Sequence, residues 1–241
     1  KRRNREGEQV LKIKKSLERG QADHGWLKSF FSFSFADYYD PDAMGFRALR
    51  VINEDEIAPA SGFPMHPHRD MEILTYVVRG ELEHRDNHGF SKIVRPGDVQ
   101  RMSAGRGVFH SEANPSSKDK LHLLQIWIVP EQKGLPFDYD QRCFSKSLAE
   151  NNIVLIASAS GRDGSILVRQ DVDLYASRSQ KECSISYELR EGRYFWLQLI
   201  RGEVQVNEKK ISAGDAIFGE GERHLAIETK GAVEFLLFDL A

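Results

Sequence analysis

The feature of this 241-residue chain that most limits its fold is a repeated pattern of short apolar runs separated by glycine turn signals. The first copy reads YVVRGELEH and then VRPGDVQRM, and the second reads LQLIRGEVQV and then ISAGDAIFGE. Each copy places an Arg-Gly-Glu hairpin signal, at Gly80 or Gly202, before a Gly-Asp turn at Gly97 or Gly214. Turn chemistry that recurs at similar intervals indicates that one β unit has been duplicated.

The rest of the chain predicts the same fold class. Runs rich in Val, Ile, Leu and Phe are short throughout, as at residues 73–78, 121–129 and 233–238. Helical periodicity is weak and confined to residues 10–19 and 145–151. Many short strands without alternating helices are typical of all-β barrels and exclude a parallel α/β sheet. The linker-like sequence EQKGLPFDYD then predicts one barrel at residues 10–136 and another at residues 137–241.

Composition excludes several classes of protein. Acidic and basic residues nearly balance, at 36 and 34, so the basic excess that binds phosphate backbones is absent and no direct nucleic-acid partner is expected. The basic segment KRRNRE is interpreted as a solvated terminus rather than a nucleic-acid or membrane arm. No apolar run is long enough for a membrane span and no signal segment opens the chain, which predicts a cytoplasmic location. The two cysteines, Cys143 and Cys183, lack CxxC spacing and are expected to be free thiols.

Two pairs of residues carry the strongest chemical signal. His66 and His68 are two residues apart in a strand-like segment, so both imidazoles project to the same face. His110 and Glu112 form a second such pair. Three imidazoles and one carboxylate suit Fe, Ni, Cu, Mn or Zn, because no thiolate biases the choice. The spacing therefore predicts a metal site in the first barrel.

Other candidates receive simpler interpretations. His84 and His88 lie in the polar hairpin EHRDNHG and are predicted to be surface residues. For His122, which sits in an apolar run, core packing and support of the site both stay open. The alternating aromatics at residues 31–35 favour core packing over a pocket wall.

The second copy tests the metal interpretation internally. Counting back from its hairpin glycine places Glu188 and Arg190 where the first copy has its histidine pair. Only His224 remains in the region that corresponds to His110. We therefore expect one barrel with metal ligands and one without.

The motifs resemble those of a known family. GFPMHPHRDMEILTYVVRGELEH resembles the first cupin motif, and PGDVQRMSAGRGVFHSEAN resembles the second. Together with FSFADYYDPDAMGFRALRVINED, they are similar to the pirin branch of two-barrel cupins, which includes bacterial quercetin 2,3-dioxygenases. The resemblance is strong over residues 17–136 and weaker to residue 240. It implies a bicupin, with two tandem antiparallel β-barrels of the jelly-roll or double-stranded β-helix type.

The resemblance also implies the site. Pirins use the residues that stand here as His66, His68, His110 and Glu112 to hold one divalent transition metal. Typical cupins use the glutamate that stands here as Glu72, so both carboxylates are catalytic candidates, Glu112 as the favoured base and Glu72 as a supporting residue or reserve. Fe(II) is the first expectation for the metal, and Ni, Cu, Mn or Zn suit the same ligands.

Two functions follow from the family. The first is a metal-dependent dioxygenase that opens a quercetin-like flavonol with O2 and releases carbon monoxide, so its partners are a small aromatic substrate and O2. The alternative is a non-enzymatic, iron-binding, redox-sensitive regulator that acts through a protein partner. The alternative predicts metal binding without ring cleavage.

Overall fold

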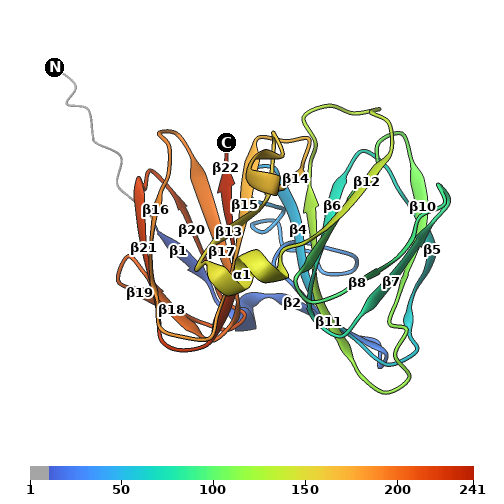
Figure 1. Cartoon of the computed structure of the whole chain (residues 1–241), viewed down its shortest axis with the longest axis horizontal. Coiled ribbons are helices and arrows are strands. Elements are labelled where there is room, and N and C mark those ends of the chain that lie inside the picture. Colours follow the sequence, from blue (N-terminus) through green and yellow to red (C-terminus); the bar gives the residue numbers. More distant parts are fainter. Residues whose placement is uncertain (1–10) are drawn as a thin grey trace. The chain divides into compact units, whose positions relative to one another are not determined.

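The computed structural model describes residues 11–241 (Figure 1). The segment KRRNRE lies outside these residues, and its interpretation stays a prediction. Nearly all regular structure in the described part is β-strand; its helices are α1 (Ser145–Glu150) and two single 3-10 turns, η1 (Ser16–Glu18) and η2 (Arg162–Gly164). None of these helices is long and apolar enough to cross a membrane. Cys143 and Cys183 are both free thiols, as predicted.

The described chain divides into two compact units. One, which we call the site unit, contains residues 19–146 and 158–171; the other, the second unit, contains residues 11–18, 147–157 and 172–241. This division differs from the single boundary predicted between residues 136 and 137. The segment after residue 137 stays in the site unit because Asp138 to Cys143 pair with Ser103 to Asp98. The N-terminal segment belongs to the second unit because Lys12 to Lys14 pair with Phe218 to Ala216.

The site unit is built from two antiparallel sheets. Its larger sheet contains, in sheet order, β12 (Asp138–Cys143), β9 (Asp98–Ser103), β6 (Glu72–Arg79), β11 (Leu121–Ile128), β4 (Leu49–Ile57), β3 (Leu27–Phe31) and β2 (Gly20–Asp23). Its smaller sheet contains β5 (Gly62–His68), β10 (Val108–Ala113), β7 (Leu82–Asp86) and β8 (Ser91–Val94). A two-residue strand, β14 (Ile166–Leu167), also lies in this unit.

The second unit repeats the plan. The strands of its larger sheet that lie in this unit are, in sheet order, β1 (Lys12–Lys14), β20 (Ala216–Glu220), β17 (Tyr194–Arg201), β22 (Val233–Leu240), β15 (Val172–Ser179) and β13 (Val154–Ser158). Its smaller sheet contains β16 (Ser184–Glu188), β21 (His224–Thr229), β18 (Glu203–Val206) and β19 (Lys209–Ser212). The predicted all-β bicupin class is confirmed. The helical pattern at residues 145–151 becomes α1, whereas the one predicted at residues 10–19 is wrong in its described part, where β1 and η1 lie.

Burial of apolar side chains explains why these segments form strands around a core. In β22, every residue from Val233 to Leu240 is buried, which is typical of a strand covered on both faces. Apolar side chains of β17 and β22, among them Phe195, Leu197 and Phe235, form the main core of the second unit. In the site unit, Val77, Leu82 and Leu121 belong to a smaller apolar cluster. Ile73, Met102 and Val108 belong to a second apolar cluster of this unit. The candidate site lies beside a cavity that both polar and apolar side chains line.

Close pairing of β5 with β10 positions the two ligand-type residue pairs. Gly62 lies opposite Ala113, and a Cβ atom at Gly62 would collide with the carbonyl oxygen of Glu112 and with the Cα of Ala113. Because these neighbours are backbone atoms, they cannot move aside without separating the strands. The glycine therefore permits the close approach of β5 to β10.

We predict that Gly62→Ala lowers the free energy of unfolding by roughly 1–3 kcal/mol, the usual cost of overpacking a well-packed site. Urea unfolding of the metal-free protein measures the change. Met65→Ala is the matched control, because Met65 lies on the same strand with 53% of its surface exposed. Equal stability of Gly62→Ala and the parent protein would contradict the close approach.

Candidate metal centre

Three histidines from two neighbouring strands converge in the site unit. His66 and His68 leave the same face of β5 because they are two residues apart. His110 on β10 lies directly opposite His66 in the antiparallel register. The ring centroids of His66 and His110 are 4.4 Å apart, and the ring of His68 lies 4.8 Å from each of them. The structure thus brings together the three histidines that the sequence spacing singled out.

The nitrogen atoms of these rings fit a metal ion. One ring nitrogen from each histidine lies within 4.8 Å of the other two. His66 donates its Nδ1 proton to the carbonyl oxygen of Pro64 at 2.8 Å, which leaves the lone pair on Nε2. The Nε2 atoms of His68 and His110 are buried and have no hydrogen-bond partner among residues 11–241. Leaving a buried polar atom unsatisfied costs about 1–3 kcal/mol, and a cation that accepts these lone pairs removes the cost.

Burial also fixes the protonation of two of the rings. Burial, followed by the charges of His110 and His66, lowers the pKa of His68 to about 4. Burial, followed by His66 and His84, lowers the pKa of His110 to about 3. Both imidazoles are therefore neutral at neutral pH. The neutral imidazole is the form that binds metal ions.

Glu112 lies beside this group. The register of β10 against β5 shifts between His110 and Glu112, so that Glu112 faces Phe63. Such an irregularity re-aims the side chains that follow it. The buried carboxylate of Glu112 accepts hydrogen bonds from Nε2 of Gln125 at 3.2 and 2.9 Å. One of its oxygens lies within 4.8 Å of ring nitrogens of His110 and His84, which places an anion at the edge of the imidazole group.

Glu72 lies elsewhere in the site unit. It is buried on β6, and its Oε2 accepts hydrogen bonds from the hydroxyl of Ser103 at 2.8 Å and from the backbone N–H of Arg169 at 3.3 Å. It belongs neither to the histidine group nor to the residues that line the adjacent cavity. The structure therefore separates the two carboxylates between which the sequence left a choice.

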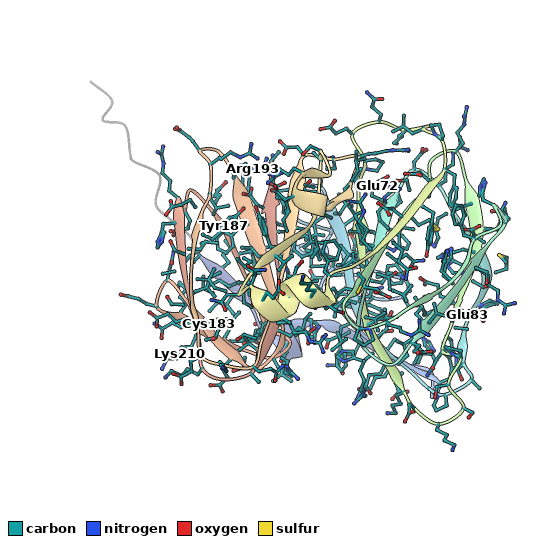
Figure 2. The ribbon with its side chains drawn as sticks, viewed as in Figure 1. Glu72, Glu83, Cys183, Tyr187, Arg193 and Lys210 are labelled. Atoms are coloured by element: carbon teal, nitrogen blue, oxygen red, sulfur yellow. The ribbon has the colours of Figure 1, made fainter. Side chains whose placement is uncertain are left out.

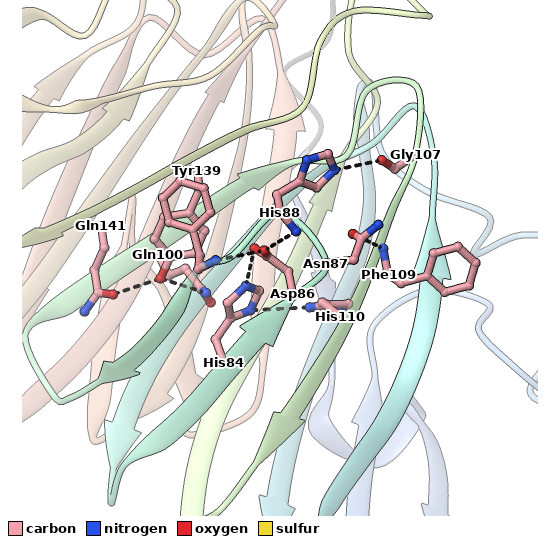
Figure 3. A network of polar contacts seen from close by, with 11 residues as sticks. His84, Asp86, Asn87, His88, Gln100, Gly107, Phe109, His110, Tyr139 and Gln141 are labelled. Carbon is pink, nitrogen blue, oxygen red and sulfur yellow. Dashed lines mark hydrogen bonds and ion pairs between the residues drawn. The ribbon is translucent and has the colours of Figure 1, made fainter.

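The prediction that His84 is a surface residue is wrong. Only 1% of its surface is exposed, because Leu82 and His84 occupy the inward positions of β7 while Arg85 faces solvent. His84 makes polar contacts with Asp86 and His110: its Nε2 lies 3.0 Å from Oδ2 of Asp86, and its Nδ1 lies 3.4 Å from Nδ1 of His110 (Figure 3). His88, in the same hairpin, is exposed as predicted.

A cavity of about 420 Å³ opens beside the histidines. Its apolar wall is mostly aromatic and consists of Leu27, Phe31, Phe35, Ala36, Phe63, Pro64 and Trp127. The Trp127 ring meets His68 edge-on at 4.9 Å and Phe35 at 5.4 Å, so the wall continues up to the imidazoles. Of the alternating aromatics, Phe33 is core as expected, whereas Phe31 and Phe35 line the cavity. A concave aromatic wall with few polar groups is typical of a small-molecule site.

One side of the cavity is polar. Ser29, Asn53 and Asp55 line it from β3 and β4, and the Ser29 hydroxyl donates to Oδ1 of Asp55 at 2.5 Å. Burial raises the pKa of Asp55 to about 7, the Ser29 hydrogen bond opposes the rise, and the negative charge of Glu112 adds to it. Near neutral pH a large fraction of this carboxyl group is protonated. It can then donate a hydrogen bond to a molecule in the cavity as well as accept one.

The corresponding part of the second unit has a different chemistry. Glu188 and His224 lie opposite each other on β16 and β21, and both are exposed. Further inside, Tyr187 and Arg193 (Figure 2) donate to the buried carboxylate of Asp239, at 2.7 and 2.5 Å. Burial, followed by the charge of Asp239, raises the pKa of Tyr187. An ion pair with satisfied hydrogen bonds thus occupies an interior that in the site unit holds unpaired imidazoles.

Sequence reasoning missed several polar residues of the site, although a signal exists. Val51 and Ile57 lie on the inward face of β4, and residues 53 and 55 between them belong to that same face. Polar residues that interrupt an apolar face are the ones to suspect, and Gln125 interrupts β11 between Leu123 and Trp127 in the same way. His122 does not line the cavity and hydrogen-bonds Glu54 at 2.9 Å.

Comparisons with known proteins agree with this geometry. The Pirin family profile matches residues 11–128, and the profile described as the quercetinase C-terminal cupin domain matches residues 155–240. The quercetin 2,3-dioxygenase of Escherichia coli K12 is 46% identical over 231 residues, which cover 96% of this chain and 99% of that protein.

Solved structures give the same result. Bacterial pirin YhhW from Escherichia coli, in complex with nickel(II), superposes with a TM-score of 0.91 and 45% identity over 96% of this chain and 99% of that one. YhaK from Escherichia coli gives a TM-score of 0.72 and 30% identity over 92% of this chain and 97% of that one. With two matching domain profiles and a relative of this identity over nearly its whole length, the chain belongs to the pirin family of two-barrel cupins.

Proposed function

We propose that this protein is a metal-dependent dioxygenase that opens the flavonol ring of quercetin-like substrates with O2 and releases carbon monoxide. The observation that carries the proposal is the group of three imidazoles, two of them with buried and unpaired nitrogens, at the wall of an aromatic cavity. The activity printed for the Escherichia coli relative supplies the reaction class.

The metal ligands in this proposal are His66, His68, His110 and Glu112. Fe(II) is the first candidate, nickel has the support of the YhhW complex, and Cu, Mn and Zn suit the same donors. When bound, such an ion supplies a Lewis acid that favours the deprotonated form of a substrate hydroxyl group, together with a centre for O2 chemistry.

Glu112 is the proposed base. Its carboxylate is buried beside His110, and Gln125 holds both of its oxygens, so its position is fixed before a substrate arrives. It accepts the proton of the ring hydroxyl that neighbours the flavonol carbonyl. Two carbon–carbon bonds of the ring then break, and the carbon between them leaves with its oxygen as carbon monoxide. Both atoms of O2 stay in the remaining ester.

The cavity residues hold the substrate and exclude water. Phe31, Phe35 and Trp127 present aromatic surfaces suited to a flat ring system. Asp55 and Ser29 supply hydrogen-bonding groups on the polar side, where hydroxyl groups of the substrate would lie. A volume of about 420 Å³ lies within the range of cavities that enclose small organic ligands.

We predict carbon monoxide release and equimolar O2 uptake when protein loaded anaerobically with Fe(II) meets quercetin in air. His66→Ala should retain no metal and release no carbon monoxide, since it removes one of three imidazoles. Gas analysis, an oxygen electrode and metal analysis give the three readings. A loaded protein that releases none would contradict the proposal and favour the regulator, and a His66→Ala variant with full metal and activity would contradict the ligand assignment.

We also predict that Glu112→Gln lowers kcat by about 100-fold or more, the usual contribution of a positioned general base. Glu72→Gln is the matched control and should keep kcat within about tenfold, because Glu72 does not line the cavity. Both variants are assayed at equal metal content, so that a change in metal retention does not enter the comparison. The reverse order of the two losses would assign the base to Glu72.

A further inference from the structure

We propose that Asp86 and His84 form a hydrogen-bonded relay that fixes the tautomer and orientation of His110 and so directs its Nε2 toward the metal. The inference rests on the proposed metal site and adds two positioning residues to it. Neither belongs to the ligand pattern of the family motifs, and the sequence analysis placed His84 on the surface.

The relay is a continuous buried chain (Figure 3). Oδ2 of Asp86 lies 3.0 Å from Nε2 of His84, and Nδ1 of His84 lies 3.4 Å from Nδ1 of His110. The side chain of His84 is 1% exposed and that of Asp86 is fully buried. Water therefore does not compete for these hydrogen bonds, and their direction is set inside the protein.

The carboxylate end determines the direction of each hydrogen bond. A carboxylate can only accept a hydrogen bond, so Nε2 of His84 must carry a proton and donate it in the hydrogen bond to Asp86. With His84 neutral, its imidazole has a single N–H, and Nδ1 of His84 is then an acceptor. Nδ1 of His110 must then donate, which leaves the lone pair of His110 on Nε2. That is the buried nitrogen without a hydrogen-bond partner.

Asp86 is itself held in place. Its Oδ1 accepts hydrogen bonds from the backbone N–H groups of His88 at 2.9 Å and Phe90 at 3.1 Å. Asp86 also lies directly opposite His110 in the register of β7 and β10. One oxygen thus serves the hairpin turn and the other faces His84. The carbonyl oxygen of Pro64 fixes the tautomer of His66 in a similar way, because it accepts the hydrogen bond from Nδ1 of that ring.

Direct ligation by His84 is the competing arrangement, because His84, His110 and Glu112 also bring their donor atoms within 4.8 Å. The hydrogen bonds decide between them. Nε2 of His84 is engaged by Asp86 and Nδ1 by His110, so direct ligation would break one of the two contacts. Outer partners of this kind typically contribute about 10–100-fold to metal affinity.

The test variant is Asp86→Asn. The amide oxygen can still accept from the backbone N–H groups of His88 and Phe90, so the turn is kept, while the NH2 group cannot accept the proton of His84. We expect the affinity for Ni(II), measured by competition with a chelator, to fall by about 10–100-fold.

Tyr139→Phe is the matched control. It removes a hydroxyl that hydrogen-bonds Gln100 and Gln141 in the same network, and it keeps the ring that packs against His84 at 5.1 Å. Its affinity for Ni(II) should equal that of the parent protein. An equal loss in both variants would show a general effect of perturbing the network and would overturn the relay.

A measurement on the unaltered protein does not depend on any variant folding. In protein with ¹⁵N-labelled histidine, loaded with diamagnetic Zn(II), long-range ¹H–¹⁵N spectra report which ring nitrogen carries each proton. The relay requires the proton of His110 on Nδ1 and that of His84 on Nε2. A metal-bound nitrogen on His84, or unchanged Ni(II) affinity in Asp86→Asn, would overturn the relay and leave the proposed site standing. A parent protein that binds no Ni(II) would overturn both.

Discussion

Antiparallel pairing between β5 and β10 is the constraint on which the geometry of the site depends. His66 lies opposite His110, and His68 is two residues further along β5. The three imidazoles therefore lie on one face of the smaller sheet. Because strand side chains alternate, a slip of one residue would send the histidines of β5 to the opposite face. Gly62 permits the close approach of the two strands, and the shift in register after His110 sets the position of Glu112. Pairing of β10 with β7 then brings His84 and Asp86 to the same place.

Polar groups concentrate in the interior of the site unit, at a cost in stability. Imidazoles with unpaired nitrogens, a buried Glu112 and an Asp55 whose pKa burial raises to about 7 lie at or beside one cavity. The second unit uses the same architecture differently, since an apolar core and the Arg193–Asp239 pair fill it. Departures from ordinary core packing that gather at one place mark functional sites. A bound metal converts the cost of the imidazole nitrogens into binding free energy.

Local signals were enough to predict much of the fold and part of the site. Glycine turn signals and short apolar runs predicted the duplicated all-β architecture, and the spacing of His66, His68 and His110 predicted their convergence. The division into units could not be read from the sequence, because it depends on the pairing of β12 with β9 and of β1 with β20, between residues far apart in the chain. His84 was misplaced because the polar hairpin around it resembles a solvent-exposed turn, whereas its inward position depends on the register of β7 against β10.

The central claim is that three imidazoles of the site unit hold one divalent metal ion. X-ray absorption at the metal edge of the Ni(II)-loaded protein, after titration to saturation, tests it directly, because imidazole rings give a distinct multiple-scattering signal. The account predicts one ion per chain with three imidazole ligands. An ion with fewer than three imidazoles, or a titration that ends with no ion bound, would contradict it.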